Sequence, residues 1–416
     1  MSSSNPIALR LKPLQALFIV VVIDVLGFGI VIPLIPYMAA QFGASPALNT
    51  WILGIYSFSQ LLAAPLWGRL SDRFGRRPIL LSSMLGACAS YLMLAFAHSV
   101  AALFVARALA GFMAGNLSAA MAYASDISRP AERARTMGTV GAAIGIGFML
   151  GPAIGGTLAG EQLQGAGLMR PALVSAAASG LAMLLVLFVL PESQSAQQRR
   201  AHAGSEPRVR AWELLRRLPA LRWLTLATLL VTFALSTLES IFAIWAMNRY
   251  HVGPRTVGMA LFALAIVAVA TQGGLVRRLA PRYGETRLAI AGIVLLAAGV
   301  ASVAFGAALP LVILGMMACG LGAGLFNPSG LALASREAQA HNRGAVMGTY
   351  QSGAALARVL APFASGPTYM HIGPGAPFLL AAVVTSQALW CILGVRRAHA
   401  AGNTASDAGV SQRGVP

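Results

Sequence analysis

The sequence is short of charge, and of acidic charge above all. Only 10% of its 416 residues are charged, and 12 Asp and Glu stand against 30 Lys and Arg. A soluble chain of this length needs far more ionic surface, so the composition excludes an ordinary water-soluble protein. With 57% hydrophobic residues and a mean hydropathy of +0.73, the chain is predicted to be an integral membrane protein.

Cysteine is also scarce. Cys88, Cys319 and Cys391 fall in long apolar stretches, and their number and surroundings suit neither a disulfide framework nor a metal site. The six histidines lie in loops or near the ends of such stretches, and no nucleophile–base pair or nucleotide-binding loop is evident. We therefore expect no metal, no cofactor and no enzymatic activity.

Long apolar stretches make up most of the chain. A helix needs roughly 20 apolar residues to cross a bilayer core of about 30 Å. Twelve stretches qualify, near 14–36, 51–67, 79–97, 100–124, 137–159, 171–190, 222–247, 256–276, 288–307, 309–333, 345–370 and 375–395. The first is longer than a signal-peptide core and is followed by Pro33 and Pro36 instead of a clear cleavage site, so it is predicted to be retained.

The twelve stretches form two sets of six. We predict an N-terminal six-helix bundle over 1–190, a linker over 191–221, a C-terminal six-helix bundle over 222–395 and a disordered cytoplasmic tail over 396–416. The linker is rich in Gln, Ser, Arg and Glu and can neither span a membrane nor bury a core. The predicted fold class is an all-α membrane protein of twelve transmembrane helices, with its two bundles related by a pseudo-two-fold axis along the membrane normal.

The basic residues predict the orientation. Placing both termini inside puts most of the 30 Lys and Arg on the inner side. The exceptions are Arg107 and Arg358 within spans and Arg170, Arg249 and Arg255 in outer loops. This is the positive-inside pattern, and it predicts that both termini are cytoplasmic. The expected location is a bacterial inner membrane, with the chain crossing it many times. The net charge of +18 is split among short loops, so anionic lipid explains it and no nucleic-acid partner is expected.

The two halves repeat short motifs in register. Three matches share an offset of 209 or 210 residues: 133–139 (RARTMGT) with 343–349 (RGAVMGT), Pro152 with Pro362, and 74–75 with 283–284. Parallel six-span repeats are typical of transporters whose halves rock about a site near the membrane midplane. We therefore expect transport by alternating access.

Residues 68–77, GRLSDRFGRR, join the second and third spans. Gly68 allows close helix approach, Gly75 permits a tight turn, and Asp72 can pair with a base or a helix N-terminus. This run resembles the signature loop of the major facilitator superfamily, and the resemblance implies a cytoplasmic latch against the other half. The second copy has Pro281 where Asp72 would fall, so such a latch is one-sided. A loop that only sets the topology is the alternative.

Asp126, at the inner end of span four, fits a pattern of the same superfamily, and we expect it to join a charge network with the Asp72 loop. A solvated helix end is the alternative. The predicted cytoplasmic gate comprises Gly68, Asp72, Arg73, Gly75, Arg76, Arg77, Asp126 and Arg133.

Spans four and five resemble those of drug/proton antiporters. Arg107-Ala-Leu-Ala-Gly111 is similar to an Arg-centred motif of that group, with Ala110 where the group often has Gln. Span five is similar to the antiporter motif at Gly141, Gly145, Gly151, Pro152, Gly155 and Gly156. A glycine about every four residues leaves a flat stripe on which another helix can pack, and Pro152 permits a bend.

The whole chain resembles the tetracycline/proton antiporter group, most clearly at 24–36, 60–78, 107–156 and the Leu-Pro-Glu-Ser that ends at Ser193. Two departures concern the substrate. That group has an acid before the Tyr of span three, where this chain has Ser90-Tyr91, and an acid in span nine, where 290–305 has none. The resemblance thus implies a monomeric drug/proton antiporter for amphipathic drugs or small organic compounds, with tetracycline-like compounds as one option.

Asp24 and Glu239 interrupt apolar runs, where a carboxylate costs several kcal/mol and marks a function by default. If spans one and four are antiparallel, Asp24 and Arg107 lie at comparable depths, roughly 15 and 20 Å at about 1.5 Å per residue. Glu239 and Arg358 are placed similarly in the second half. We predict these four as proton-coupling residues, since a carboxylate could gain a proton on one side and release it on the other. A structural ion pair is the alternative for each.

A cavity for amphipathic compounds needs aromatic and apolar walls with a few polar groups. The candidates are Tyr56, Gln60, Asn116, Gln272, Phe326, Asn327, Tyr350 and Gln351. Ordinary helix packing is an equal alternative for each aromatic residue, and a Gln or Asn in a span often hydrogen-bonds a neighbouring helix.

The leading functional hypothesis is proton-coupled efflux, with a small amphipathic substrate, protons and membrane lipid as partners. The alternatives are a proton-independent uniporter or importer on the same fold, in which Asp24 would be structural, and a non-transporting receptor or scaffold.

Overall fold

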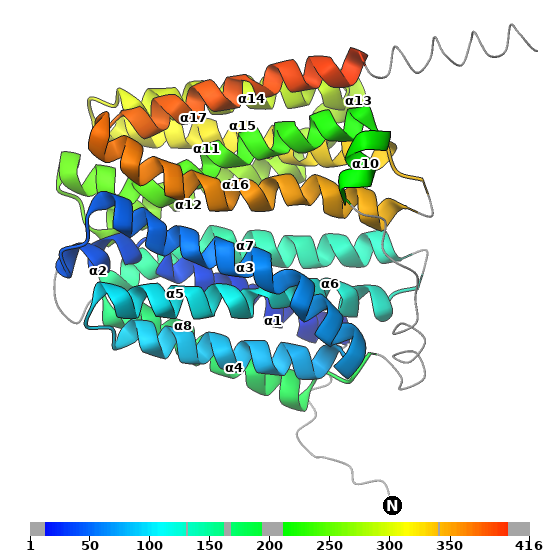
Figure 1. Cartoon of the computed structure of the whole chain (residues 1–416), viewed down its shortest axis with the longest axis horizontal. Coiled ribbons are helices and arrows are strands. Elements are labelled where there is room, and N and C mark those ends of the chain that lie inside the picture. The colour runs from blue at the N-terminus through cyan, green and yellow to red at the C-terminus, as the bar shows by residue number, and fades with distance from the viewer. Residues whose placement is uncertain (1–12, 130–131, 162–167, 194–210, 340–341, 398–416) are drawn as a thin grey trace, which may run out of the picture. The chain divides into compact units, whose positions relative to one another are not determined.

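The computed structural model describes residues 13–129, 132–161, 168–193, 211–339 and 342–397. Every regular element in these ranges is a helix, and the long helices of each unit run side by side (Figure 1). Most of the predicted linker, 194–210, and of the predicted tail, 398–416, lies outside the described residues.

The chain divides into two compact units. The first comprises Met1–Glu206 together with Glu239–Phe262, and the second Pro207–Leu238 together with Ala263–Pro416. Residues 239–262 pack on the first six spans at one end, where Glu161 accepts hydrogen bonds from the Gly253 amide (2.9 Å) and the Thr256 hydroxyl (2.7 Å). This division therefore differs from the predicted boundaries around residue 222, and the two six-helix bundles stay a prediction.

The first unit is built mainly from the first half of the chain. Its elements are α1 (Pro13–Val31), α2 (Ile35–Gln41), α3 (Pro46–Phe74), α4 (Arg76–Ala95), α5 (Val100–Met113), the 3₁₀ turn η1 (Ala114–Asn116), α6 (Leu117–Asp126), α7 (Arg133–Ala159) and α8 (Met169–Phe188). Helix α1 packs against α7 and α8, α4 against α8, and α3 against α5. Their buried core includes Leu17, Met84 and Tyr123.

The second unit contains the rest of the helices. They are α10 (Ala211–Arg217), the first part of α11 (Pro219–Tyr250), the last part of α12 (Pro254–Ala270), the π-helical turn η2 (Thr271–Leu275), α13 (Val276–Tyr283), α14 (Glu285–Ala304), α15 (Leu309–Arg336), α16 (Arg343–His371) and α17 (Ala376–Ser386). The most extensive packing in this unit joins α14 to α15, with α17 also against α14.

Ten helical segments among the described residues are long and apolar enough to cross a membrane. They are Pro13–Gln41, Arg76–Ala95, Val100–Asp126, Arg135–Ala159, Met169–Phe188, Pro219–Tyr250, Pro254–Tyr283, Glu285–Ala304, Leu309–Arg336 and Ala376–Arg397. The predicted spans at 51–67 and 345–370 coincide with α3 and α16, which have 29 residues each but are more polar. The number twelve therefore stays a prediction.

Large apolar side chains cover much of the outer surface. Phe188, Phe305 and Trp390 are 71%, 72% and 65% exposed. In water such a surface would drive association, whereas in a bilayer it meets lipid tails while the helices satisfy their own backbone groups.

The glycine stripe of α7 allows close contact with α1. A Cβ atom added to Gly151 would lie 2.6 Å from the Cα of Gly29, so only glycine permits this approach. Gly155 faces the backbone of Ile30 in the same way, and Gly156 faces the start of α12. A side chain at Gly141, by contrast, would meet open space.

Candidate functional site

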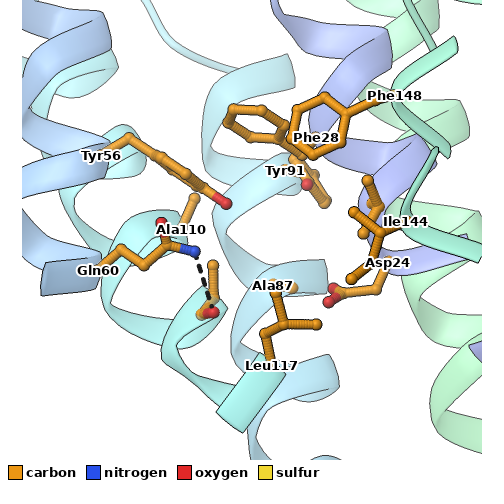
Figure 2. A pocket seen from close by; sticks show the side chains of 12 residues that line it. Asp24, Phe28, Tyr56, Gln60, Ala87, Tyr91, Ala110, Leu117, Ile144 and Phe148 are labelled. Atoms are coloured by element: carbon orange, nitrogen blue, oxygen red, sulfur yellow. Dashed lines mark hydrogen bonds between the residues drawn. The ribbon is translucent and has the colours of Figure 1, made fainter. Parts of the chain in front are cut away.

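A small cavity lies inside the first unit, between α1, α3, α4, α7 and the interrupted helix α5–η1–α6. It is lined by Asp24, Val25, Phe28, Tyr56, Gln60, Ala87, Tyr91, Ala110, Ala114, Leu117, Ile144 and Phe148. Figure 2 shows Asp24 on one wall and Tyr56 and Gln60 on the opposite one. The cavity volume is about 60 Å³, which is room for a few water molecules.

Asp24 is the one charged residue among those that line the cavity. Its side chain is half-buried and lies within hydrogen-bonding reach of the side chain of Asn116. Asn116 is itself 2% exposed, and its Nδ2 donates to the hydroxyl of Ser83 at 2.6 Å. Asn116, predicted to contact substrate, therefore faces the acid from within the protein.

Arg107 is 1% exposed and is held by aromatic rings. Its guanidinium carbon lies 4.4 Å from the ring centre of Tyr56 and 5.4 Å from that of Phe28. Its Nε and Nη1 atoms have no hydrogen-bond partner among the described residues. A cation over a ring face gains electrostatic energy that partly replaces its lost hydration.

Asp24 and Arg107 border the same cluster without forming a direct pair. Tyr91 interacts electrostatically with both of them. In the part of the chain that the structure describes, no salt bridge joins the two, so they are connected through Tyr56 and Tyr91. Their shared role in proton coupling stays a prediction.

Span four is interrupted beside the cavity. Helix α5 ends at Met113, and the 3₁₀ turn η1 separates it from α6, so the regular α-helical hydrogen-bond pattern is interrupted there. Side chains of α3 bond two carbonyls at this interruption: Trp67 Nε1 donates to Phe112 (2.6 Å) and Gln60 Nε2 to Ala114 (3.2 Å). Gln60 therefore lines the cavity and also supports the break.

A second polar cluster lies at the junction of α3 and α4. Arg76 is 5% exposed; its Nη1 donates to Asp72 (2.7 Å) and to Ser71 (3.0 Å), and its Nε donates to Asp126 (3.1 Å). We call Ser71, Asp72, Arg76, Asp126, Glu192 and Ser193 the Arg76 cluster. The charge network expected between the Asp72 loop and Asp126 is thus present within the first unit.

Glu192 belongs to this cluster although sequence reasoning did not identify it. Its carboxylate accepts from the backbone amides of Arg76 (2.9 Å) and Arg77 (3.2 Å), the first residues of α4, and it packs against Gly75 at φ +105°. Ser193 donates to Asp126 at 3.1 Å. The sequence did hold a signal for Glu192, because this acid closely follows the sixth apolar stretch. That end of the stretch lies at the same level as the start of α4.

The other gate candidates have looser surroundings. Arg77 donates to the backbone carbonyls of Val186 (3.3 Å) and Leu187, the guanidinium of Arg73 lies 5.3 Å from the ring centre of Phe74, and Arg133 begins α7 with an exposed side chain. A side chain at Gly68 would meet open space.

The candidates of the second half do not gather at this cavity. Glu239 belongs to the first unit and Arg358 to the second, and both side chains are exposed, so their pairing stays a prediction. Gln272 lies exposed in η2. Phe326 and Tyr350 are buried, whereas Asn327 and Gln351 are exposed.

A multi-pass helical protein with one carboxylate in an internal cavity and a charged cluster at a helix junction has the features of a membrane transporter. The chain belongs to the Major Facilitator Superfamily, whose family model matches residues 17–282 and 275–413. The predicted family and fold are thereby confirmed. Because members of this family are transporters, the prediction that the protein is not an enzyme is confirmed as well.

Proteins whose names give different substrates are similar to this chain in sequence or in fold. The class C tetracycline resistance protein of Escherichia coli is 28% identical over 349 residues, which cover 82% of this chain and 86% of that protein. The crystal structure of the human organic anion transporter MFSD10 (TETRAN) is similar with a TM-score of 0.69 and 24% identity, covering 91% of this chain and 98% of that one. A crystal structure of the nucleoside transporter NupG has a TM-score of 0.69 and 15% identity, covering 94% and 99%.

Proposed function

We propose that the protein exports amphipathic small organic compounds across a bacterial inner membrane in exchange for protons. Asp24 is the coupling carboxyl group, and transport proceeds by alternating access. The observation that carries the proposal is the position of Asp24, the one charged group on the wall of a cavity otherwise lined mainly by aromatic and aliphatic side chains.

A carboxyl group in such a cavity responds to its surroundings. Loss of hydration disfavours its charged form, whereas water or a nearby donor favours that form. A change in which side of the membrane reaches the cavity would therefore change whether Asp24 holds a proton. Acids at this depth in membrane proteins commonly belong to proton pathways.

The cavity walls support an amphipathic substrate. Phe28, Tyr56 and Phe148 offer ring surfaces, and Asp24 and Gln60 offer polar contacts, which is the usual composition of a small-molecule site. The relatives named above handle different compounds, and Ser90 and 290–305 lack the acids of the tetracycline group. We therefore propose the class of compound and leave tetracycline as one probe among several.

The Arg76 cluster supports the orientation. Its cation, Arg76, belongs to the arginine-rich 68–77 loop at one end of the first unit, and the positive-inside pattern favours the cytoplasm for that end. We propose that this cluster is part of the cytoplasmic gate.

The test uses purified protein in proteoliposomes that enclose a pH-sensitive dye. Tetracycline, ethidium and a rhodamine dye serve as probes, and an imposed proton gradient drives their movement. The parent is expected to accumulate at least one probe with a matching proton flux. Asp24→Asn should lower gradient-driven accumulation at least about tenfold. Exchange of unlabelled for labelled probe should continue in this variant.

Glu285→Gln, which alters a partly buried carboxylate far from the cavity in sequence, is the control and should transport normally. If the parent equilibrates a probe at the same rate with and without a gradient, the protein is a uniporter. Proton coupling would also be rejected if Asp24→Asn retained full gradient-driven accumulation.

A further inference from the structure

Asn116 is the last residue of η1, at the point where span four is interrupted and α6 begins. Its side chain is buried between Ser83 of α4 and Asp24 of α1. Two observations about its hydrogen bonds show which partner is available to the amide nitrogen and which to the amide oxygen.

The first observation concerns Ser83. The hydroxyl of Ser83 donates to the carbonyl of Leu80 at 3.0 Å, so its oxygen is left to accept from Nδ2 of Asn116 at 2.6 Å. This arrangement orients the amide, because a hydroxyl has only one proton to donate. The second N–H of the amide remains for the carboxylate of Asp24.

The second observation concerns the amide oxygen. Oδ1 of Asn116 is buried and has no hydrogen-bond donor among the described residues. A buried acceptor without a donor is unfavourable, and such atoms in native proteins often have a functional reason. An ionised Asp24 carries no proton and cannot supply the missing donor.

A protonated Asp24 can supply it. A carboxylic acid and a primary amide can form a two-bond ring, in which the amide N–H donates to the acid carbonyl and the acid O–H donates to the amide carbonyl. Ionised Asp24 can make only the first of these bonds. Protonation would therefore add a bond and satisfy Oδ1 without turning the amide away from Ser83.

We infer that Asn116 is a positioning residue that binds the protonated form of Asp24 through this paired hydrogen bond. The inference rests on the proposed coupling role of Asp24 and adds the partner that distinguishes the two protonation states.

The other groups around Asp24 have different contacts. Tyr56 of α3, Tyr91 of α4 and Arg107 of α5 are the titratable and charged side chains that face this region, and Arg107 lies on the rings of Tyr56 and Phe28. Helix α7 contributes the apolar side chains Ile144 and Phe148. From α8, the hydroxyl of Ser175 donates to the carbonyl of Gly27 (3.2 Å). None of these contacts supplies a donor to Oδ1 of Asn116.

The position of Asn116 also connects the cavity to the Arg76 cluster. Helix α6 runs from Leu117 directly after Asn116 to Asp126, which accepts from Arg76. A change in the bonds of Asn116 therefore acts at one end of a short helix whose other end belongs to the proposed gate.

Infrared difference spectroscopy on the reconstituted protein tests the inference with protons as the only ligand. Acidification is expected to produce a carbonyl band of a protonated carboxyl group that disappears in Asp24→Asn. In Asn116→Leu this band should move to higher wavenumber, because the acid loses both bonds to the amide. Asn116→Ser, which replaces the amide with a single hydroxyl that can still make one hydrogen bond, should give a smaller shift. It is the variant to use if the leucine variant does not fold.

Asn49→Leu is the matched control. Asn49 is also 2% exposed, its Nδ2 donates to the carbonyl of Pro36 (2.9 Å), and its Oδ1 likewise lacks a described partner, but, unlike Asn116, its side chain does not interact with Asp24. The Asp24 band should be unchanged in this variant. Gradient-driven uptake should fall about fivefold or more in Asn116→Leu and stay within about twofold of the parent in the control.

The outcomes separate the two proposals. If acidification produces no band that depends on Asp24, the coupling role of Asp24 is overturned and this inference with it. If the band is present and lost in Asp24→Asn but keeps its position in both Asn116 variants, only the role of Asn116 is overturned.

Discussion

The two halves of the chain each place a salt bridge at the same junction, but with opposite charges. Arg76 begins α4 and pairs with Asp126 at the end of α6 (3.1 Å). Glu285 begins α14 and pairs with Arg336 at the end of α15 (2.7 Å). The residue offsets are 209 and 210, the same as in the sequence repeat. Both halves therefore have an ion pair between the same two positions of the repeat, but the cation is at the first position in one half and at the second position in the other.

The surroundings of the two pairs differ more than the pairs themselves. The side chain of Arg76 is 6% exposed and also bonds Asp72, whereas Arg336 is 60% exposed and its described ion pair is with Glu285 alone. Pro281 stands where a counterpart of Asp72 would be. Gly75 and Gly284 share the positive φ of the turn, 105° and 78°, but only Gly75 has a carboxylate packed against it. The repeat thus preserves the turn and the pair, and among the described residues the first half alone adds a network.

Removing the cation should distinguish the two junctions most strongly. Arg76→Ala leaves Asp72 and Asp126 close together without their shared cation, which should cost roughly 3 kcal/mol. Arg336→Ala breaks an exposed pair and should cost less than about 1 kcal/mol. Thermal unfolding in detergent measures both changes. Equal losses of stability would contradict the view that only the first junction is a network.

Reversing the charges tests whether the junction accepts either polarity. Arg76→Glu alone brings a third acid to Asp72 and Asp126 and should be strongly destabilising. Adding Asp126→Arg restores an opposite pair and should recover part of the loss, with a coupling energy of about 1–3 kcal/mol in a double-mutant cycle. The mirror exchange, Glu285→Arg with Arg336→Glu, should change stability by less than about 1 kcal/mol. A double mutant of the first junction no better than Arg76→Glu alone would show that polarity is fixed there.

The smallest expected effect concerns Glu192. Glu192→Gln keeps the shape of the cap on α4 but removes the charge that two backbone amides and the helix dipole favour, so we expect a loss of about 1 kcal/mol. Glu213→Gln in the exposed pair of α10 is the control and should cost less than about 0.5 kcal/mol. A loss no larger than that of the control would mean that Glu192 does not hold the start of α4.

Several residues of the site could be predicted from the sequence because they interrupt an apolar run or match a known motif. Asp24 was found because an acid interrupts an apolar run, and the Asp72 loop because its spacing matches a family signature. Depth along a helix could also be estimated, so Asp24 and Arg107 were expected in one layer. Their contacts could not be estimated, since the direction in which a side chain leaves its helix depends on packing. The rings of Tyr56 and Phe28 contact Arg107, and the ion pair with Asp24 that was the structural alternative is not found among the described residues.

For other residues the tertiary contacts add what the local sequence does not show. Glu192 looks like the start of a surface linker, and only the approach of α4 to the end of α8 turns it into a cap. Asn116 looks like a polar lining residue, but the 3₁₀ turn places it against Ser83. Phe326 and Tyr350 are buried, in line with the packing alternative.

By itself the sequence determined the membrane setting, the family and the positions of the acids along their helices, because hydropathy, motif spacing and rise per residue are properties of the local chain. The tertiary structure decided which partner each polar group has, from the rings on Arg107 to the charge-inverted pairs at the two junctions. Those choices depend on how neighbouring helices are rotated and how closely they approach, and side chains far apart in the chain determine both.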